Sequence, residues 1–203
     1  MEKMQRNRII VMSIMSYYAR QIFDETKGYE FRKSPLKDQD LAKRIYEITD
    51  FICEDYPKHR EWYFHKQLPR IFTPNGEILF ARADDDTTIL AMACLKKDEE
   101  EKKICTLYVS DQCRGQHLGT RMVEASIDFL ETTKPLITLA DYKLPMFQPI
   151  IDKYGWELTE VVEGLYNDKA KELCFNGTLT KQANMNEQGV YLVKKIKDNN
   201  SNT

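Results

Sequence analysis

The chain has 203 residues, of which 42% are hydrophobic and 31% are charged, a composition that suits one globular domain and excludes disorder for the bulk of the chain. Thirty basic and 32 acidic residues leave a formal charge of -2, so there is no overall positive field that would attract nucleic acid. The five cysteines are odd in number and show no CxxC spacing, which argues against a disulfide framework and a thiolate zinc site. We therefore expect a cytoplasmic protein with no metal and no nucleic-acid partner.

The N-terminal residues 9–15 form an apolar run preceded by basic residues. The run is too short to span a bilayer, which takes about 20 residues, and no small-residue cleavage site follows it. We expect residues 1–27 to form a helical extension whose apolar face docks on the domain or on a second copy of the chain. A homodimer therefore stays open, and no membrane contact is expected.

The first half of the remaining chain predicts a strand, two helices and an antiparallel meander. Apolar residues at steps of three and four predict a helix that opens at Asp38 and ends before Pro57. An aromatic-rich segment predicts a second helix that stops near Pro69. Apolar runs around polar turns then predict the strands of the meander. In order, these segments are residues 29–32 (strand), 38–56 and 62–72 (helices), and 77–83, 87–95 and 104–109 (strands).

The second half alternates helices and strands. A strongly periodic helix begins near residue 118, and its residues that share one face are Leu118, Met122, Ala125, Ser126 and Phe129. Further elements follow from apolar runs and helix-stop residues. They are residues 136–140 (strand), 147–154 (helix), 156–165 (strand), 168–176 (short helix before Gly177) and 189–196 (strand), followed by a polar tail at 198–203.

The segment that carries chemistry is the loop between the third meander strand and the periodic helix. A strand, a tight loop and a helix N-terminus together direct several backbone N–H groups outward, and the helix dipole adds partial positive charge there. Arg114 adds a full positive charge, and Gly119 lets a phosphate approach the backbone. The sequence therefore predicts an anion site in this loop.

This loop resembles that of the GNAT acetyltransferase superfamily, whose pattern R/Q-x-x-G-x-G/A lies between the fourth strand and the following helix. Arg114 and Gly119 match the pattern, and residues 149–156 resemble the family's P-F-Y-E-K-x-G-F run. The resemblance implies an α+β (α/β) GNAT fold over residues 28–197, with a mixed, mostly antiparallel central sheet of six to seven strands flanked by helices. It also implies that acetyl-coenzyme A is the co-substrate and that the acetyl group moves to a primary amine of a small molecule or peptide.

The resemblance assigns coenzyme A binding to two groups of residues. The strand that would lie along the pantetheine arm carries backbone N–H groups that would polarise the thioester carbonyl, and the loop amides would bind the diphosphate. The residues are Leu107, Tyr108 and Val109 on the strand, and Arg114, Gly115, Gln116, His117, Leu118, Gly119 and Thr120 in the loop and helix start.

The chain departs from the family pattern at two positions. His117 replaces the first glycine of the loop pattern, although histidine is among the residues that tolerate a positive φ. Ile151 replaces the tyrosine that protonates the leaving thiolate in the family, and Tyr154, one helical turn further on, is the candidate substitute. The candidate general base is Asp141, because the strand at 104–109 carries no carboxylate.

Each of these catalytic candidates has a structural alternative. Tyr154 could pack at the end of its helix, Asp141 could cap a strand end, and a water relay could replace the base. The two departures also leave open a non-catalytic module that binds acyl-coenzyme A. The aromatic residues between positions 56 and 72 could shape an acceptor pocket or pack on the sheet, and His59 and His65 do not specify a metal site without a third ligand.

Overall fold

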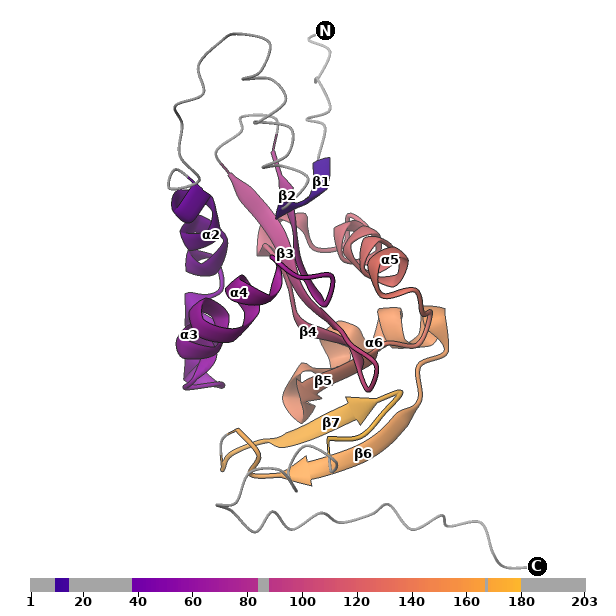
Figure 1. Ribbon diagram of the computed structural model, residues 1–203. Helices are drawn as coiled ribbons and strands as arrows, with labels where there is room; N and C mark the ends of the chain where they lie inside the picture. The colour runs from indigo at the N-terminus through magenta and orange to yellow at the C-terminus, as the bar shows by residue number, and fades with distance from the viewer. Residues whose placement is uncertain (1–9, 15–37, 84–87, 167, 180–203) are drawn as a thin grey trace, which may run out of the picture. The chain divides into compact units, whose positions relative to one another are not determined.

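The computed structural model describes residues 10–14, 38–83, 88–166 and 168–179. These residues belong to two compact units, which divide between residues 131 and 132 (Figure 1). Each unit has its own antiparallel strands, four in the first unit and three in the second. The seven strands fall within the predicted range, and the predicted α+β class is confirmed.

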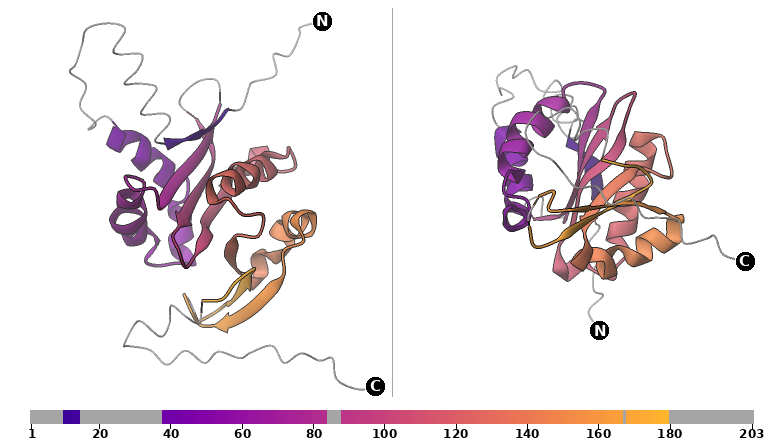
Figure 2. Two further views of the ribbon diagram at one scale, coloured as in Figure 1. Left: turned by 45° about the vertical axis from the view of Figure 1, so that its right-hand side comes forward. Right: turned by 90° about the horizontal axis from the view of Figure 1, so that it is seen from below.

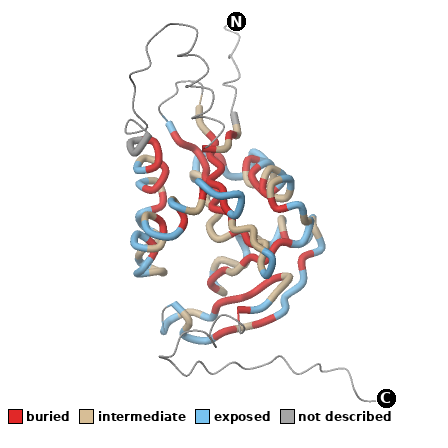
Figure 3. Tube along the Cα trace, viewed as in Figure 1, coloured by how far each residue is buried: buried red, intermediate tan, exposed pale blue. Residues whose placement is uncertain are grey.

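The first unit is built on four strands, β1 to β4, in the order β1-β2-β3-β4. Each neighbouring pair is antiparallel, so the predicted meander is confirmed. The two central strands are buried along almost their whole length (Figure 3), because helices cover both of their faces. The bounds are Ile10–Ser13 (β1), Gly76–Arg82 (β2), Ile89–Lys97 (β3) and Lys102–Val109 (β4).

The helices of the first unit form two layers. The helical segments within residues 38–70 pack on one face of the strands, and α5 packs on the other (Figures 1 and 2). The first layer consists of α2 (Asp38–Glu47), the 3-10 turn η2 (Asp50–Glu54), α3 (His59–Trp62), the π-helical turn η3 (Tyr63–Gln67) and α4 (Leu68–Arg70). On the opposite face lies α5 (Leu118–Leu130), and the 3-10 turn η4 (Asp111–Cys113) precedes it.

The π-helical turn explains how the second predicted helix continues past Pro69. A proline inside an α-helix removes one backbone hydrogen bond and its ring clashes with the carbonyl four residues earlier. The widened turn Tyr63–Gln67 lies immediately before α4, which contains Pro69, and a π turn of this kind relieves such a clash. Fully buried Gln67 donates through Nε2 to the carbonyls of Glu77 (3.0 Å) and Leu95 (3.1 Å) and thereby fixes the turn against β2 and β3.

Lysines from the β3–β4 hairpin hold the C-terminal end of α5. Lys97 Nζ donates to the carbonyl of Phe129 (3.2 Å) and lies 2.8 Å from Glu131 Oε1. Lys102 Nζ donates to the carbonyl of Glu131 at 3.3 Å. These two cations satisfy carbonyls at the negative end of the helix dipole. The opposite end of α5 begins at the loop that the sequence singles out.

The second unit contains β5 (Leu136–Ala140), the 3-10 turn η5 (Asp141–Lys143), α6 (Leu144–Tyr154), β6 (Leu158–Glu163) and β7 (Lys171–Phe175). The strand β7 lies between β5 and β6 and is antiparallel to both. The predicted strand at 136–140, the helix ending at Tyr154 and the strand within 156–165 are therefore confirmed.

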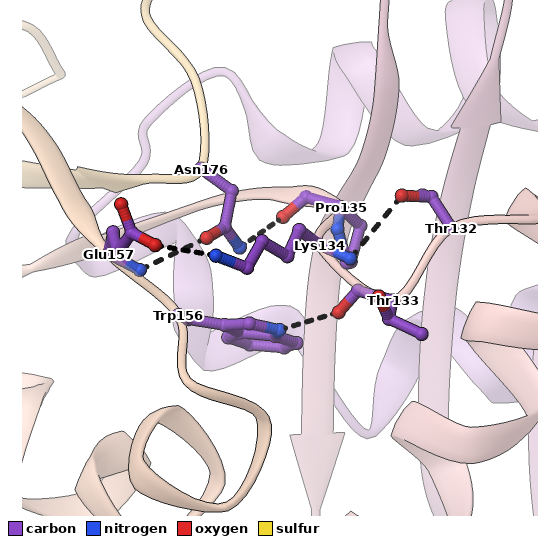
Figure 4. Close-up of polar contacts among 7 residues, drawn as sticks. All are labelled: Thr132, Thr133, Lys134, Pro135, Trp156, Glu157 and Asn176. Atoms are coloured by element: carbon purple, nitrogen blue, oxygen red, sulfur yellow. Dashed lines mark hydrogen bonds and ion pairs between the residues drawn. The ribbon is translucent and has the colours of Figure 1, made fainter.

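A polar network fixes the segment before β5 against the segments that flank β6 and β7 (Figure 4). Trp156 Nε1 donates to the carbonyl of Thr133 at 2.9 Å. Asn176 Nδ2 donates to the carbonyl of Pro135 at 2.9 Å, and Asn176 Oδ1 accepts from the amide of Glu157 at 3.0 Å. Lys134 pairs with Glu157, with Nζ and Oε1 2.5 Å apart. The second unit is thus held by directed hydrogen bonds as well as by its apolar core.

Two predicted helices are wrong where the structure describes them. Residues 10–13 form the strand β1, because the β-branched pair Ile10 and Val11 suits the pairing that this segment makes with β2. Residues 171–175 form the strand β7, whose last four residues are buried between two partner strands. Residue 14, in the same predicted extension, is helical. The predicted strands at 29–32 and 189–196, the other residues of the N-terminal extension and the polar tail lie outside the described residues.

We expect His59 to make the stability of the first unit depend on pH. Its ring is 6% exposed and stacks between Tyr46 and Trp62, with centroid distances of 5.7 and 5.8 Å. Burial lowers the pKa of His59 to about 4, against a smaller opposing effect of the charge of Asp50. Between pH 6.5 and about 4 only the unfolded chain is protonated at this residue, so unfolding takes up a proton and becomes easier as the pH falls. The free energy of unfolding should lose up to roughly 3 kcal/mol across this window.

Urea unfolding of the wild type and His59→Phe at several pH values between 7 and 4 measures this effect. The wild type should lose stability relative to His59→Phe as the pH falls, since the phenyl ring fills the same stack without titrating. The matched control is His65→Phe, at an exposed position in the π turn. A difference between wild type and His59→Phe that stays constant with pH would contradict the assignment.

Candidate functional site

The end of β4 directs two backbone amides away from β3. The amide of Ser110 donates to the carbonyl of Leu90 at 2.8 Å, and the register pairs Met92 with Tyr108. In an antiparallel pair, residues alternate between those that bond to the partner strand and those that do not. The N–H groups of Ser110 and Tyr108 therefore point toward β3, and those of Leu107 and Val109 point to the opposite edge of β4. These are the two amides that the sequence prediction singles out for the thioester.

The loop after β4 is closed by a series of short backbone bonds. The amide of Cys113 donates to the carbonyl of Ser110 (2.9 Å), and that of Gln116 donates to the carbonyl of Cys113 (3.4 Å). The side chain of Gln116 also donates to the carbonyl of Gln112, at 2.8 Å. Hydrogen bonds within the loop therefore fix its conformation.

Two residues of this loop have left-handed backbone conformations. Gly115 has a φ of 74°, and His117, directly before α5, has a φ of 60°. The expectation that His117 accepts a positive φ in place of glycine is confirmed. A left-handed residue at this point turns the chain sharply from the loop into the helix.

The N-terminal end of α5 presents free amide donors. Within the part of the chain that the structure describes, no hydrogen bond is donated by the backbone amides of Gly115, His117, Leu118, Gly119 and Thr120. The side chain of His117 does not cap the helix, and the first intrahelical bond runs from the amide of Arg121 to the carbonyl of His117 at 3.1 Å. Free amides at the positive end of a helix dipole form a site that attracts anions.

Arg114 lies directly before these amides, and its charge is already paired. Its Nη2 lies 2.6 Å from Asp111 Oδ1, and its side chain is 45% exposed. Its backbone amide donates to the carbonyl of the same Asp111 at 3.2 Å. Asp111 could not be identified from the sequence, because opposite charges three residues apart indicate an ion pair on a helix surface but not in a loop.

The side chain of Tyr108 faces the helical layer on the side of α2 and α3. Its ring lies 5.6 Å from that of Phe51 in η2, centroid to centroid. Burial, and to a smaller extent the charge of Asp111, raises the pKa of Tyr108. Phe51 is half exposed, whereas Tyr63 in the predicted aromatic segment is fully buried and donates its hydroxyl to the carbonyl of Ala42. Tyr63 is therefore a packing residue.

The ten residues predicted to bind coenzyme A all belong to the first unit, on β4, the loop and the first turn of α5. The two catalytic candidates, Asp141 and Tyr154, belong to the second unit.

Asp141 begins the 3-10 turn after β5, and its Oδ1 accepts a hydrogen bond from the amide of Tyr142 at 2.9 Å. Tyr154 is the last residue of α6, and its ring stacks on Trp156 at 5.7 Å. The hydroxyl of Tyr154 is buried and has no hydrogen-bond partner among the described residues. Ile151, in the position of the family's tyrosine, is 5% exposed.

The thiols of Cys94 and Cys105 are poorly suited to carry an acyl group. None of the five cysteines, all of which are described residues, forms a disulfide. Burial raises the pKa of Cys94, and it raises that of Cys105 to about 11. A buried and protonated thiol is a weak nucleophile.

The described residues contain no group of three or more histidine, cysteine, aspartate or glutamate side chains that could hold a metal ion. None of their helices combines the length and the apolar character that crossing a bilayer requires.

Residues 41–140 match the sequence model of the acetyltransferase (GNAT) family. This segment contains β2, β3, β4, the loop and all of α5. The chain belongs to the GNAT family. No curated protein matches this GNAT chain in sequence.

Solved structures of low sequence identity resemble this GNAT chain. An acetyltransferase of the GNAT family from Desulfovibrio desulfuricans is 10% identical, with a TM-score of 0.56 over 83% of this chain and 97% of that one, which shows a shared fold. PaiA N-acetyltransferase from Thermoplasma acidophilum, in complex with coenzyme A, is 13% identical, with a TM-score of 0.49 over 83% of this chain and 98% of that one. Nourseothricin acetyltransferase is 14% identical, with a TM-score of 0.46 over 50% of this chain and 64% of that one. The match thus spans less than two thirds of that last protein.

We expect His117 to be replaceable by glycine but not by a β-branched residue. A left-handed conformation costs a side chain about 1–2 kcal/mol, and glycine avoids this cost. His117→Gly should therefore be as stable as the wild type or up to about 1 kcal/mol more stable, because the side chain forms no cap that would be lost. His117→Val should be less stable by about 1–2 kcal/mol.

Urea unfolding of both variants measures this order. His65 lies in a helical turn, where glycine is the poorer of the two residues, so His65→Gly and His65→Val should show the reverse order. Equal stabilities of His117→Gly and His117→Val would contradict the strained conformation.

Proposed function

We propose that this GNAT chain is an acetyl-coenzyme A-dependent N-acetyltransferase that moves the acetyl group to a primary amine by direct attack on the thioester. The observation that carries the proposal is the set of unbonded amides of Gly115, His117, Leu118, Gly119 and Thr120 at the positive end of α5, beside Arg114. A diphosphate needs several N–H donors and positive charge at short range, and this loop supplies both. Arg114, Gly115, Gln116, His117, Leu118, Gly119 and Thr120 would bind the diphosphate.

The end of β4 would bind and polarise the thioester. Negative charge develops on the carbonyl oxygen when an amine attacks a thioester, and fixed amide donors stabilise that charge. The amides of Leu107 and Val109 point away from β3 and are the candidates for this role. Tyr108, between them, would contact the pantetheine arm.

Two proton transfers would involve the second unit. An alkylamine with a pKa of about 10.4 is almost fully protonated at neutral pH, so a base must remove a proton before it attacks. We assign this role to Asp141, directly or through water. We assign protonation of the leaving thiolate to Tyr154, whose buried hydroxyl bonds to no described residue and is therefore free to donate.

The acceptor would be a primary amine on a small molecule or a peptide. Catalysis would take place in the cytoplasm, where the five free cysteines suit reducing conditions. A second copy of the chain remains a candidate partner.

One observation favours a second function, binding of acyl-coenzyme A without turnover. Buried Ile151 replaces the family's proton-donating tyrosine, and β4 carries no carboxylate. Coenzyme A thiolate is a tolerable leaving group, since an ordinary thiol has a pKa of about 8.5, so the loss of one acid need not abolish transfer. The two functions differ in turnover, not in binding.

Charge reversal at Arg114 tests the diphosphate site. Arg114→Glu places a negative charge beside the bound diphosphate, so its affinity for coenzyme A should fall by at least about tenfold at moderate salt. Calorimetric titration with coenzyme A measures this change. The matched control is Arg60→Glu on α3, which makes the same charge change at an exposed position in the helical layer and should leave affinity unchanged. Unchanged affinity in Arg114→Glu would reject the site.

Turnover tests the acetyltransferase itself. Wild-type protein with acetyl-coenzyme A should release free thiol with at least one member of a panel of polyamines, amino acids, aminoglycosides and basic peptides. Tyr154→Phe preserves the ring stacked on Trp156 but removes the hydroxyl, so the rate should fall by about 10²-fold or more while coenzyme A affinity is kept.

The matched control for Tyr154→Phe is Tyr142→Phe, which removes an exposed hydroxyl from the same unit. Full activity in Tyr154→Phe would reject Tyr154 as the acid. Coenzyme A binding by the wild type without thiol release on any amine would favour the binding module.

A further inference from the structure

We propose that Asp111 is a positioning residue that holds Arg114 away from the co-substrate and thereby weakens its binding. This inference rests on the proposed function, because it concerns the affinity of the same loop for a diphosphate. It goes beyond that function because it assigns a role to a residue outside the ten predicted contacts.

The first observation is that the Arg114 guanidinium is already occupied by a carboxylate. Asp111 Oδ1 lies 2.6 Å from Arg114 Nη2. A carboxylate and a phosphate use the same N–H donors of a guanidinium. If both N–H groups of Arg114 Nη2 are to donate to a phosphate, the contact of Nη2 with Asp111 must loosen.

The second observation is that the carboxylate is not needed to build the loop. The backbone amide of Arg114 donates to the backbone carbonyl of Asp111 at 3.2 Å, and the amide of Cys113 donates to the carbonyl of Ser110 at 2.9 Å. Neither bond uses the Asp111 side chain, which is 82% exposed. An ion pair this exposed contributes little to folding. The main effect of the carboxylate is therefore electrostatic: it lowers the positive charge of the loop.

The third observation concerns the field that a bound diphosphate would meet. Asp111 adds a negative charge that contacts Arg114 and belongs to the same loop as the free amides that lead into α5. A charge this close repels a dianion and also cancels much of the attraction of Arg114. Both effects lower affinity, and both are screened by salt because the groups are exposed.

Removing the charge should therefore tighten binding. In Asp111→Asn the amide oxygen can still accept from Arg114, but the ion pair and the repulsion are lost. We expect coenzyme A and inorganic pyrophosphate to bind about 3- to 10-fold more tightly at low ionic strength, and the gain should shrink as salt is added. Asp111→Ser should show the same direction, and Asp111→Glu, which retains the charge, should stay close to the wild type.

The experiment is calorimetric titration of the full chain with coenzyme A and, separately, with inorganic pyrophosphate at two salt concentrations. Asp128→Asn is the matched control, since it removes one exposed negative charge from α5 at about 15 Å along the helix from its first residue. It should change affinity by less than twofold. In an Arg114→Gln background, Asp111→Asn should give a smaller gain, because part of its effect acts through Arg114.

The outcomes separate the two proposals. If the wild type binds neither coenzyme A nor pyrophosphate, the proposed function fails at its binding site. If the wild type binds but Asp111→Asn and Asp111→Ser bind no more tightly, the role of Asp111 is wrong while the binding site stands. An equal gain from Asp128→Asn would also overturn it, since the effect would then be one of net charge.

Discussion

The candidate site depends on how α5 is anchored at its two ends. One end of this helix is held by Lys97 and Lys102, whose ammonium groups satisfy carbonyls at residues 129 and 131. The other end is held by Leu118, which is 1% exposed and anchors the first turn in the core. Because the first turn is anchored by Leu118 alone, its unbonded amides remain available at the end of the helix that follows the loop. The anion site is therefore a consequence of how the helix is fixed at both ends.

The loop adds geometry to this electrostatic arrangement. The two left-handed residues, Gly115 and His117, let the chain reverse between η4 and α5 within a few residues. A residue that forbids this turn would move the amides, even if every charge were kept. Arg114 and Asp111 then set how strongly the amides attract an anion. Backbone conformation fixes the position of the site, and side-chain charge adjusts its affinity.

Most of the fold and the binding half of the site could be predicted from local pattern. The strand at 136–140 and the helix from 118 have strong periodicity, and Arg114 and Gly119 stand in the family's spacing. The predictions for residues 10–13 and 171–175 were wrong because short segments carry too little periodicity to separate a helix from a strand, and pairing with β2, β5 and β6 decided the outcome.

Contacts between side chains could not be predicted from the sequence, for a different reason. The pairing of Asp111 with Arg114 and the packing of Tyr108 on Phe51 depend on the path of a loop and the face of a strand. The periodicity of α5 was predicted correctly, but Val123 and Leu130 are buried where Ala125 and Phe129 were expected, because the core selects the exact face. The sequence pattern thus predicts where the helices and strands lie, and core packing determines which of their residues are buried.

The division of the proposed roles between the two units has a chemical consequence. All candidate groups for binding lie before residue 131, on β4, the loop and α5, and both candidate groups for proton transfer lie after it. In the proposed binding half, Arg114 and Gly119 fit the pattern of the family that the loop resembles, whereas in the proposed proton-transfer half buried Ile151 stands where that pattern has a tyrosine. Binding energy and proton transfer contribute separately to a rate, since the first sets occupancy and the second lowers the barrier. A chain that keeps the first and alters the second can still bind acyl-coenzyme A fully. Its rate of transfer then depends on whether the unbonded hydroxyl of Tyr154 can supply the proton that Ile151 cannot.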